Sequence, residues 1–192
     1  MARTREFERD TALDRATEIF ARHGYEGSST SDLLAHMGIS RQSLYDTFGD
    51  KKRLFLEALE RYAMASLAAV QAKLNAPGPI GKAIAAALLV DIVDGPPGFE
   101  NGCVGVGSIA EFGRADAEVN AINDRAGEAF VVAFAERLRR GIAESELPAT
   151  LDAPSAAHFL LASRSGLKLA ARGGASAETL GEIAGFAVRG LH

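Results

Sequence analysis

Apolar residues recur every three or four positions along most of this chain, which is the spacing of one face of a helix. The first such stripe predicts an amphipathic helix over residues 7–23 and consists of Leu13, Ala16, Ile19 and Phe20. Similar patterns predict helices over residues 51–74, 80–93, 115–144, 154–172 and 177–191. A short helix is expected to start within residues 101–108 and to end near Gly113. No segment alternates apolar and polar residues as a half-buried strand does, so we expect an all-α fold.

Two further short helices in the N-terminal third are joined by a very tight turn. Thr30 is placed to cap a helix over residues 32–37, and Ser40 to cap another over residues 41–48. Only Gly38 and one more residue separate them. Helices joined so closely must cross steeply, which is the geometry of a helix-turn-helix whose second helix enters a major groove. These two bring the expected total to about nine helices.

The second short helix has an inner and an outer face. Helical spacing turns Leu44 and Phe48 toward the rest of the head. The residues that can face outward are Arg41, Gln42, Ser43, Tyr45, Asp46 and Thr47. Asp46 would repel a phosphate, so we expect it to orient Arg41 or to accept a hydrogen bond from a cytosine.

Composition indicates a helical protein of a reducing compartment. Hydrophobic residues make up 47% of the 192, enough for a sizeable core, and Trp is absent. Cys103 is the single cysteine, so no intrachain disulfide can form, and a cytoplasmic location is favoured. The charged stretch from Arg3 to Asp14 leads us to expect no secretory signal, and the longest apolar run, residues 84–90, is too short to span a bilayer. We expect no membrane association.

The net charge of −4 does not by itself favour a nucleic-acid partner. Up to Arg53, however, nine Lys and Arg balance nine Asp and Glu, and the excess of acid lies in the remainder of the chain. Phosphate contact needs a local basic edge and not a basic protein. Candidates for such an edge are Arg3, Arg5, Arg41, Lys51, Lys52 and Arg53. Each of them also fits an ordinary solvated surface charge.

Residues 13–59 carry an ordered set of motifs. An amphipathic helix ends in the run FARHGYEGSST, followed by DLLA, GISR, SLY, Phe48 and then Lys51 to Phe55. This pattern, over about the first third of the chain, resembles the TetR family of transcriptional regulators. The pairs Gly102-Cys103 and Glu111-Phe112 with Gly113 resemble the body of one large branch of that family.

The resemblance implies an architecture and a function. TetR-like proteins are all-helical homodimers, and here the three-helix DNA-binding head would be residues 1–50 and the ligand-binding, dimerising body residues 51–192. Such a dimer binds a near-palindromic, double-stranded operator and is released by a small molecule in the body. The expected protein is therefore a transcriptional regulator without cofactor or enzymatic activity, most often a repressor, with activation left open.

Candidate DNA contacts follow from the resemblance and from helix geometry. Recognition helices usually read bases with their N-terminal residues, so Arg41 and Gln42 are candidates for base edges. Gln42 departs from the small residue or Pro of many relatives, and its amide suits adenine. Tyr45 and Lys51 match positions that touch phosphate in the family, although a packed surface aromatic and a solvated charge remain open. The complete expected set is Thr30, Arg41, Gln42, Ser43, Tyr45 and Lys51.

Candidate walls for an effector pocket come from apolar residues of the body. They are Leu67, Val70, Leu88, Ile92, Phe99, Val106, Phe130 and Phe134, and plain core packing is the alternative for each. Cys103 is counted with them because it lies near the start of a short helix, where N–H groups lower the pKa of a thiol. The second functional hypothesis is therefore a redox- or electrophile-sensing regulator acting through Cys103, against a small buried hydrophobe.

The last two helices are the expected dimer interface. Their candidate contact residues are Leu160, Leu161, Leu167, Leu180, Ile183 and Ala187. Two helices from each subunit would form a four-helix bundle. An intramolecular core role for one of the two stripes is the alternative.

An enzyme is the competing class of function. His158 and Cys103 would be a nucleophile pair only if the fold brought them together, and His158 has apolar neighbours on its helix. The glycines of residues 102–107 follow no strand and include no GKS or GKT. The four histidines are scattered, so no metal site is expected. A purely structural module would not need the surface from Arg41 to Lys51.

Overall fold

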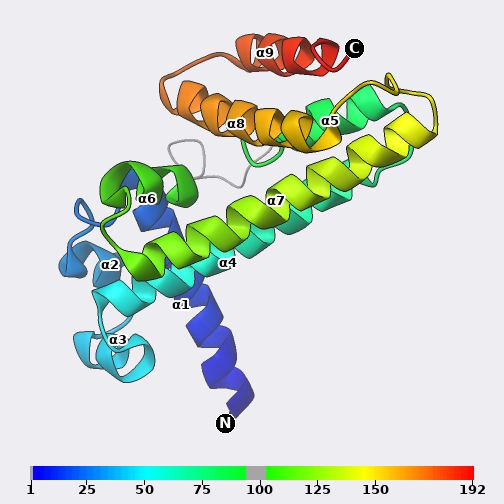
Figure 1. Cartoon of the computed structure of the whole chain (residues 1–192). Coiled ribbons are helices and arrows are strands. Elements are labelled where there is room, and N and C mark those ends of the chain that lie inside the picture. The colour runs from blue at the N-terminus through cyan, green and yellow to red at the C-terminus, as the bar shows by residue number, and fades with distance from the viewer. Residues whose placement is uncertain (1, 94–102) are drawn as a thin grey trace. The chain divides into compact units, whose positions relative to one another are not determined.

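The computed structural model describes residues 2–93 and 103–192, with side chains from residue 9 onward. Within these residues the chain forms nine α-helices and no strand, which confirms the all-α prediction (Figure 1). The helices are α1 (Ala2–His23), α2 (Thr30–Met37), α3 (Arg41–Phe48), α4 (Lys51–Leu74), α5 (Ile80–Leu89), α6 (Val104–Phe112), α7 (Ala117–Ala143), α8 (Ala153–Arg172) and α9 (Ala177–Arg189).

The helices group into two compact units. Unit 1 comprises Met1–Ala63 and Asn101–Asn123, and unit 2 comprises Met64–Glu100 and Asp124–His192. Helices α4 and α7 contribute their first residues to unit 1 and the remainder to unit 2. Because α6 belongs to unit 1, this unit is larger than the predicted head of residues 1–50, and the functional boundary at residue 50 stays a prediction.

Short polar side chains cap the helices of the head. Ser40 Oγ accepts the N–H of Ser43 at 3.1 Å at the start of α3, as predicted. Asp50 Oδ1 likewise accepts the N–H of Arg53 at 2.8 Å, so it caps α4. The predicted cap of α2 is wrong by one residue, because Ser29 Oγ accepts the helix N–H group and Thr30 is already helical. Capping needs extended backbone, which Ser29 adopts with a ψ of 152°.

Helix α5 is four residues shorter than the pattern predicted. Its apolar run continues to Val93, but the helix ends at Leu89 because Val90 is extended, with a ψ of 141°. Asp91 follows in the left-handed region with a φ of 62°. The continuous apolar residues concealed this ending because it depends on a contact with a distant helix.

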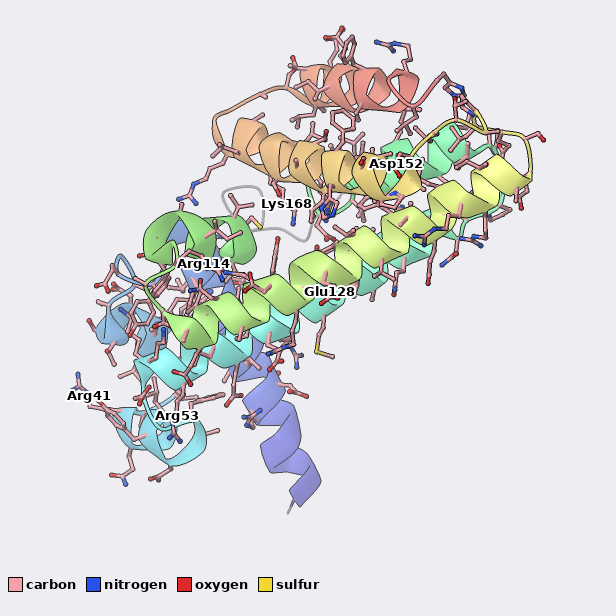
Figure 2. All side chains as sticks on the ribbon, in the orientation of Figure 1. Arg41, Arg53, Arg114, Glu128, Asp152 and Lys168 are labelled. Carbon is pink, nitrogen blue, oxygen red and sulfur yellow. The ribbon has the colours of Figure 1, made fainter. Side chains whose placement is uncertain are left out.

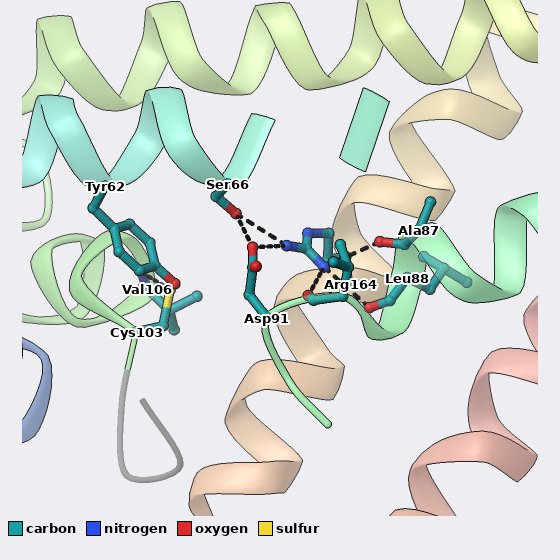
Figure 3. Close-up of polar contacts among 9 residues, drawn as sticks. Tyr62, Ser66, Ala87, Leu88, Asp91, Cys103, Val106 and Arg164 are labelled. Carbon is teal, nitrogen blue, oxygen red and sulfur yellow. Dashed lines mark hydrogen bonds and ion pairs between the residues drawn. The ribbon is translucent and has the colours of Figure 1, made fainter. Parts of the chain in front are cut away.

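That contact is made by Arg164 of α8 (Figure 3). This side chain is only 2% exposed. Its Nη1 donates to the carbonyl oxygens of residues 87, 88 and 90 at 2.8–3.1 Å, where the C-terminal carbonyls of α5 have no helical partner. Its Nη2 donates to Ser66 Oγ at 3.0 Å and to Asp91 Oδ2 at 3.2 Å. A cation thus sits among acceptors at the negative end of the α5 dipole.

The two units have separate apolar interiors. In unit 1 the buried residues of the head include Phe20, Leu33, Leu44, Phe48 and Phe55. In unit 2 one cluster joins α5, α7, α8 and α9 and includes Ile84, Leu88, Phe134, Leu138, Leu160 and Leu180. No helix in the described part of the chain is long and apolar enough to cross a membrane.

Candidate nucleic-acid interface

Helix α3 presents a polar outer face, as its sequence predicted. Leu44 and Phe48 are 1% and 3% exposed, so they hold the helix to the head. Arg41 points outward from α3 (Figure 2). The other exposed residues of this helix are Gln42, Ser43, Tyr45 and Asp46, with Thr47 half-buried. A helix fixed by its inner face and polar on its outer face can enter a groove without unfolding.

The turn before α3 sets the angle at which this face projects. Gly38 has a φ of 70° and donates its N–H to Leu34 O at 3.0 Å. Ile39 donates to the same oxygen at 3.3 Å, which closes α2 in two residues. A side chain at Gly38 would be strained in the left-handed conformation, so glycine is the residue that permits so short a turn. At the same end of α2, Arg15 Nη1 donates a hydrogen bond to Met37 O at 3.2 Å.

The expected phosphate contacts lie in the same unit, and two of the three are at helix starts. Thr30 is the first residue of α2, where N–H groups without helical partners favour an anion. Asp32 is in the same turn, and its carboxylate accepts a hydrogen bond from Ser29 Oγ at 2.6 Å. The negative charge of Asp32 weakens the attraction of this helix start for an anion. Lys51 is the first residue of α4, and Tyr45 is half exposed on α3.

Lys51 rests on an aromatic ring that the sequence did not single out. Its Nζ lies 4.3 Å from the centroid of the Tyr25 ring. Burial, followed by the negative charges of Glu26 and Asp50, raises the pKa of Tyr25 above its ordinary value of 10.0. Tyr25 therefore stays neutral and presents an aromatic face, which attracts a cation. The motif GYEG marked this tyrosine as part of a turn, but nothing local indicated its contact with Lys51.

The basic edge is smaller than the sequence indicated. Lys52 forms an ion pair with Asp116, and its Nζ lies 4.5 Å from the Phe112 ring centroid, so it serves unit 1 internally. Arg41 and Arg53 are exposed, and Lys51 is partly exposed. The side chains of Arg3 and Arg5 lie outside the described residues.

Residues predicted to line a pocket belong to both units. In unit 2, Val70, Leu88 and Phe134 are 0% exposed, as core residues are, whereas Leu67, Ile92 and Phe130 pack against the same cluster and retain some exposure. Cys103 and Val106 belong to unit 1, and Phe99 lies outside the described residues.

The Cys103 thiol is the N-cap of α6 and is 8% exposed. Its Sγ accepts hydrogen bonds from Tyr62 Oη at 3.2 Å and from the N–H of Val106 at 3.4 Å (Figure 3). Both donors favour the thiolate over the thiol, and burial opposes them.

The predicted dimer contacts are mostly core residues of a single chain. Leu160, Leu167, Leu180 and Ala187 are 0–3% exposed inside unit 2, so they have almost no surface left for a partner. This is the intramolecular alternative for those four positions. Leu161 is half-buried and Ile183 is exposed. The exposed stripes instead consist of Phe159, Ala162, Gly166 and Leu169 on α8 and of Thr179, Ile183 and Phe186 on α9, with Gly190 directly after α9.

Comparisons with known proteins agree with this geometry. Residues 12–58 match the family described as bacterial regulatory proteins, tetR family. The chain is 32% identical to the HTH-type transcriptional repressor ComR of Escherichia coli, over 97% of this chain and 90% of ComR. It is 51% identical over 84 residues to the HTH-type transcriptional regulator YezE of Bacillus subtilis, a match spanning 44% of this chain and 43% of YezE.

A solved structure extends the likeness to the complete fold. The TetR family transcriptional regulator CifR, determined as a cysteine mutant with 26-bp double-stranded operator DNA, superposes with a TM-score of 0.78 and 30% identity. The match covers 95% of this chain and 96% of CifR.

Proposed function

This chain belongs to the TetR family of transcriptional regulators, and we propose that it is a repressor that binds a near-palindromic operator as a homodimer. The observation that carries the proposal is α3, whose inner face is buried by Leu44 and Phe48 and whose outer face is polar and exposed. ComR is itself a repressor, and CifR was solved on operator DNA, which supports the same role here. The protein would act in the cytoplasm.

Each residue of the interface has a proposed task. Arg41 and Gln42 read base edges from the first turn of α3, and Ser43 lies beside them. Tyr45 and Lys51 bind phosphates on either side of the groove, and Thr30 offers its hydroxyl and the helix N–H groups to a third. Phosphate contacts determine the register on the duplex, so that the base-reading residues meet a defined sequence.

The test is a selection of genome fragments by the purified protein, followed by titration of the best site. Arg41→Ala should weaken operator binding by roughly ten- to a hundredfold and relax the preference at one base pair of each half-site. Arg139→Ala is the matched control, because this exposed arginine belongs to unit 2. Absence of any enriched site at low salt would contradict the proposal, because nonspecific attraction is strongest there.

The exposed stripes of α8 and α9 support a dimer built from these helices. A Cβ added to Gly166, in the exposed stripe of α8, would meet no atom within 4 Å among the described residues, so the chain's own packing does not require glycine there. Glycine in a helix interior costs about 1 kcal/mol relative to alanine. Close approach of a partner helix provides a reason for bearing that cost, and Phe159, Leu169 and Phe186 would supply buried area.

A small molecule is the proposed signal, and unit 2 is its proposed site. Leu67, Ile92 and Phe130 combine apolar character with remaining exposure, so they are the most accessible of the candidate wall residues. An effector must bind the DNA-incompetent state more tightly, and operator DNA must then weaken effector binding by the same factor. Compounds that raise the melting temperature should therefore also lower operator affinity; a compound that binds without this reciprocal effect is not the effector.

The second candidate signal is covalent modification of Cys103. The hydrogen bonds from Tyr62 and Val106 favour the nucleophilic thiolate, which would displace iodide from iodoacetamide. Operator binding should then fall in the wild type and be unchanged in Cys103→Ser. Equal responses of the two proteins would exclude this route and leave the noncovalent effector.

A further inference from the structure

We propose that Glu111 and Phe112, at the end of α6, are positioning residues for DNA binding, because they hold Tyr25 beneath the ammonium group of Lys51. This inference rests on the proposed function in one respect, the contact of Lys51 with phosphate. All four residues belong to unit 1, together with the helix-turn-helix. Helix α6 thus contributes to operator affinity even though none of its residues is expected to touch DNA.

Glu111 holds the turn between α1 and α2 by its backbone. Its Oε2 accepts the N–H of Tyr25 at 2.8 Å, and its Oε1 accepts the N–H of Glu26 at 2.7 Å. The turn begins at Gly24, whose φ of 72° favours glycine and whose added Cβ would lie 2.8 Å from Glu111 Oε2. The turn is therefore shaped around this carboxylate, and both carboxylate oxygens serve to fix the backbone of Tyr25.

Phe112 holds the side chain of the same tyrosine. Its ring centroid lies 5.4 Å from the ring centroid of Tyr25. The ring centroid of Phe55, on α4, lies 5.1 Å from the same Tyr25 centroid. Lys51 Nζ lies 4.3 Å from the Tyr25 centroid. Lys52 is engaged with Phe112 and with Asp116, which follows α6, so these two residues together determine which of the two adjacent lysines remains available to a phosphate.

The ring affects affinity by preorganisation. A free lysine side chain must lose much of its rotamer freedom when it binds a phosphate, and a lysine already resting on a ring has lost part of it beforehand. If the turn shifts, this advantage disappears. Positioning therefore predicts that loss of Glu111 weakens DNA binding. Simple electrostatics predicts the opposite change in affinity, because removal of the negative charge of Glu111 should make DNA binding tighter.

The decisive variant is Glu111→Gln, which preserves the size of the side chain and removes its charge. Positioning predicts that binding to the selected operator weakens by roughly three- to tenfold. In a Lys51→Met background the same substitution should change affinity by less than about twofold, because the group it positions is gone. Glu118→Gln is the control, an exposed acid of unit 1 on α7 whose loss should leave affinity unchanged or slightly raised.

Phe112→Leu is a second test of the inference, in case Glu111→Gln lowers affinity only because the protein unfolds. It keeps an apolar side chain on α6, and it should lower affinity with the same dependence on Lys51, while circular dichroism shows intact helix. Glu111→Gln binding as tightly as the wild type, or a loss that persists in the Lys51→Met background, would overturn the inference. A wild type that selects no DNA site would instead overturn the proposed function itself, so the two failures are distinct.

Discussion

Two cationic sites, one in each unit, lie in opposite environments. In unit 1, Lys51 and Lys52 lie on the faces of Tyr25 and Phe112 at the edge of the unit. In unit 2, Arg164 is buried, and its guanidinium donates to carbonyl oxygens and to Asp91 within the unit. A cation at an edge can exchange its contacts for those of a partner, whereas a buried one is committed to the fold. The comparison separates Lys51, for which we propose a role in recognition, from Arg164, which serves the structure of unit 2.

The largest expected effect is the loss of stability when the buried cation of unit 2 is removed. Arg164→Met keeps a long flexible side chain but leaves three carbonyl oxygens without their side-chain donor and Asp91 without its charged partner. Loss of one partner of a buried charged network typically costs about 3–5 kcal/mol, so urea should unfold the variant at much lower concentration. Arg172→Met, at the exposed end of α8, is the control and should differ from wild type by a few tenths of a kcal/mol. Equal stability of the two variants would show that Arg164 is not the residue that holds the end of α5.

A substitution in the exposed stripe of α9 should change the association of subunits and leave the folding stability of each chain nearly unchanged. Phe186 is 71% exposed, so Phe186→Glu should leave the stability of a single chain nearly unchanged. Because Phe186 belongs to the proposed interface, its loss should weaken the proposed dimer by about 2 kcal/mol or more, and light scattering at low micromolar concentration should then detect monomer. Met64→Glu alters another apolar side chain of unit 2, 68% exposed on α4, and is expected to remain dimeric. If Phe186→Glu stays fully dimeric, the subunits associate through another face.

Smaller effects are expected at the helix caps of unit 1. Ser40→Ala removes the acceptor for the N–H of Ser43, and Ser29→Ala removes that for Asp32, at about 1 kcal/mol each in thermal unfolding. Thr30→Ala should cost less, because Thr30 is not the cap. The reverse order of the Ser29 and Thr30 variants would restore Thr30 as the cap.

The smallest expected effect is the pH response of the Lys52–Asp116 pair. The hydrogen bond from Lys52, followed by that from the N–H of Val119, holds the pKa of Asp116 below its ordinary value of 3.8. The folded pKa is lower than the unfolded one, so the contribution to stability is present above the unfolded pKa and is lost as pH falls through the folded value. Wild type and Asp116→Asn should therefore differ slightly at pH 7 and converge in strong acid. Added salt should reduce the difference at pH 7, because the pair is partly exposed.

Much of unit 1 was predictable because the residues that define its helix ends and faces are close to those features in the sequence. Ser40, Gly38 and Asp50 lie within a few residues of the helix ends that they define, and the alternation of Leu44 and Phe48 with polar residues defines the faces of α3. Tyr25 was not predictable as a support for Lys51, because the contact joins positions 26 residues apart through a ring placed by α6. Local pattern carries no information about that distance.

The last two helices show where sequence pattern was insufficient to identify the exposed face. Helices α8 and α9 each carry apolar or small residues around most of their circumference, so two stripes on each are consistent with the sequence. Packing of α8 and α9 against α5 and against each other buries the stripe containing Leu160, Leu167 and Leu180, and leaves Phe159 and Phe186 exposed.

The amino-acid sequence by itself determined the helices, most of their ends and the polar face of α3, because backbone preference, caps and helical period act within a few residues. Only the tertiary structure decided where α5 stops, which lysine is engaged with Asp116, and which faces of α8 and α9 are covered. Each of these depends on a side chain from a distant segment. Burial between helices depends on how the helices pack together, and the sequence of one helix alone does not determine that packing.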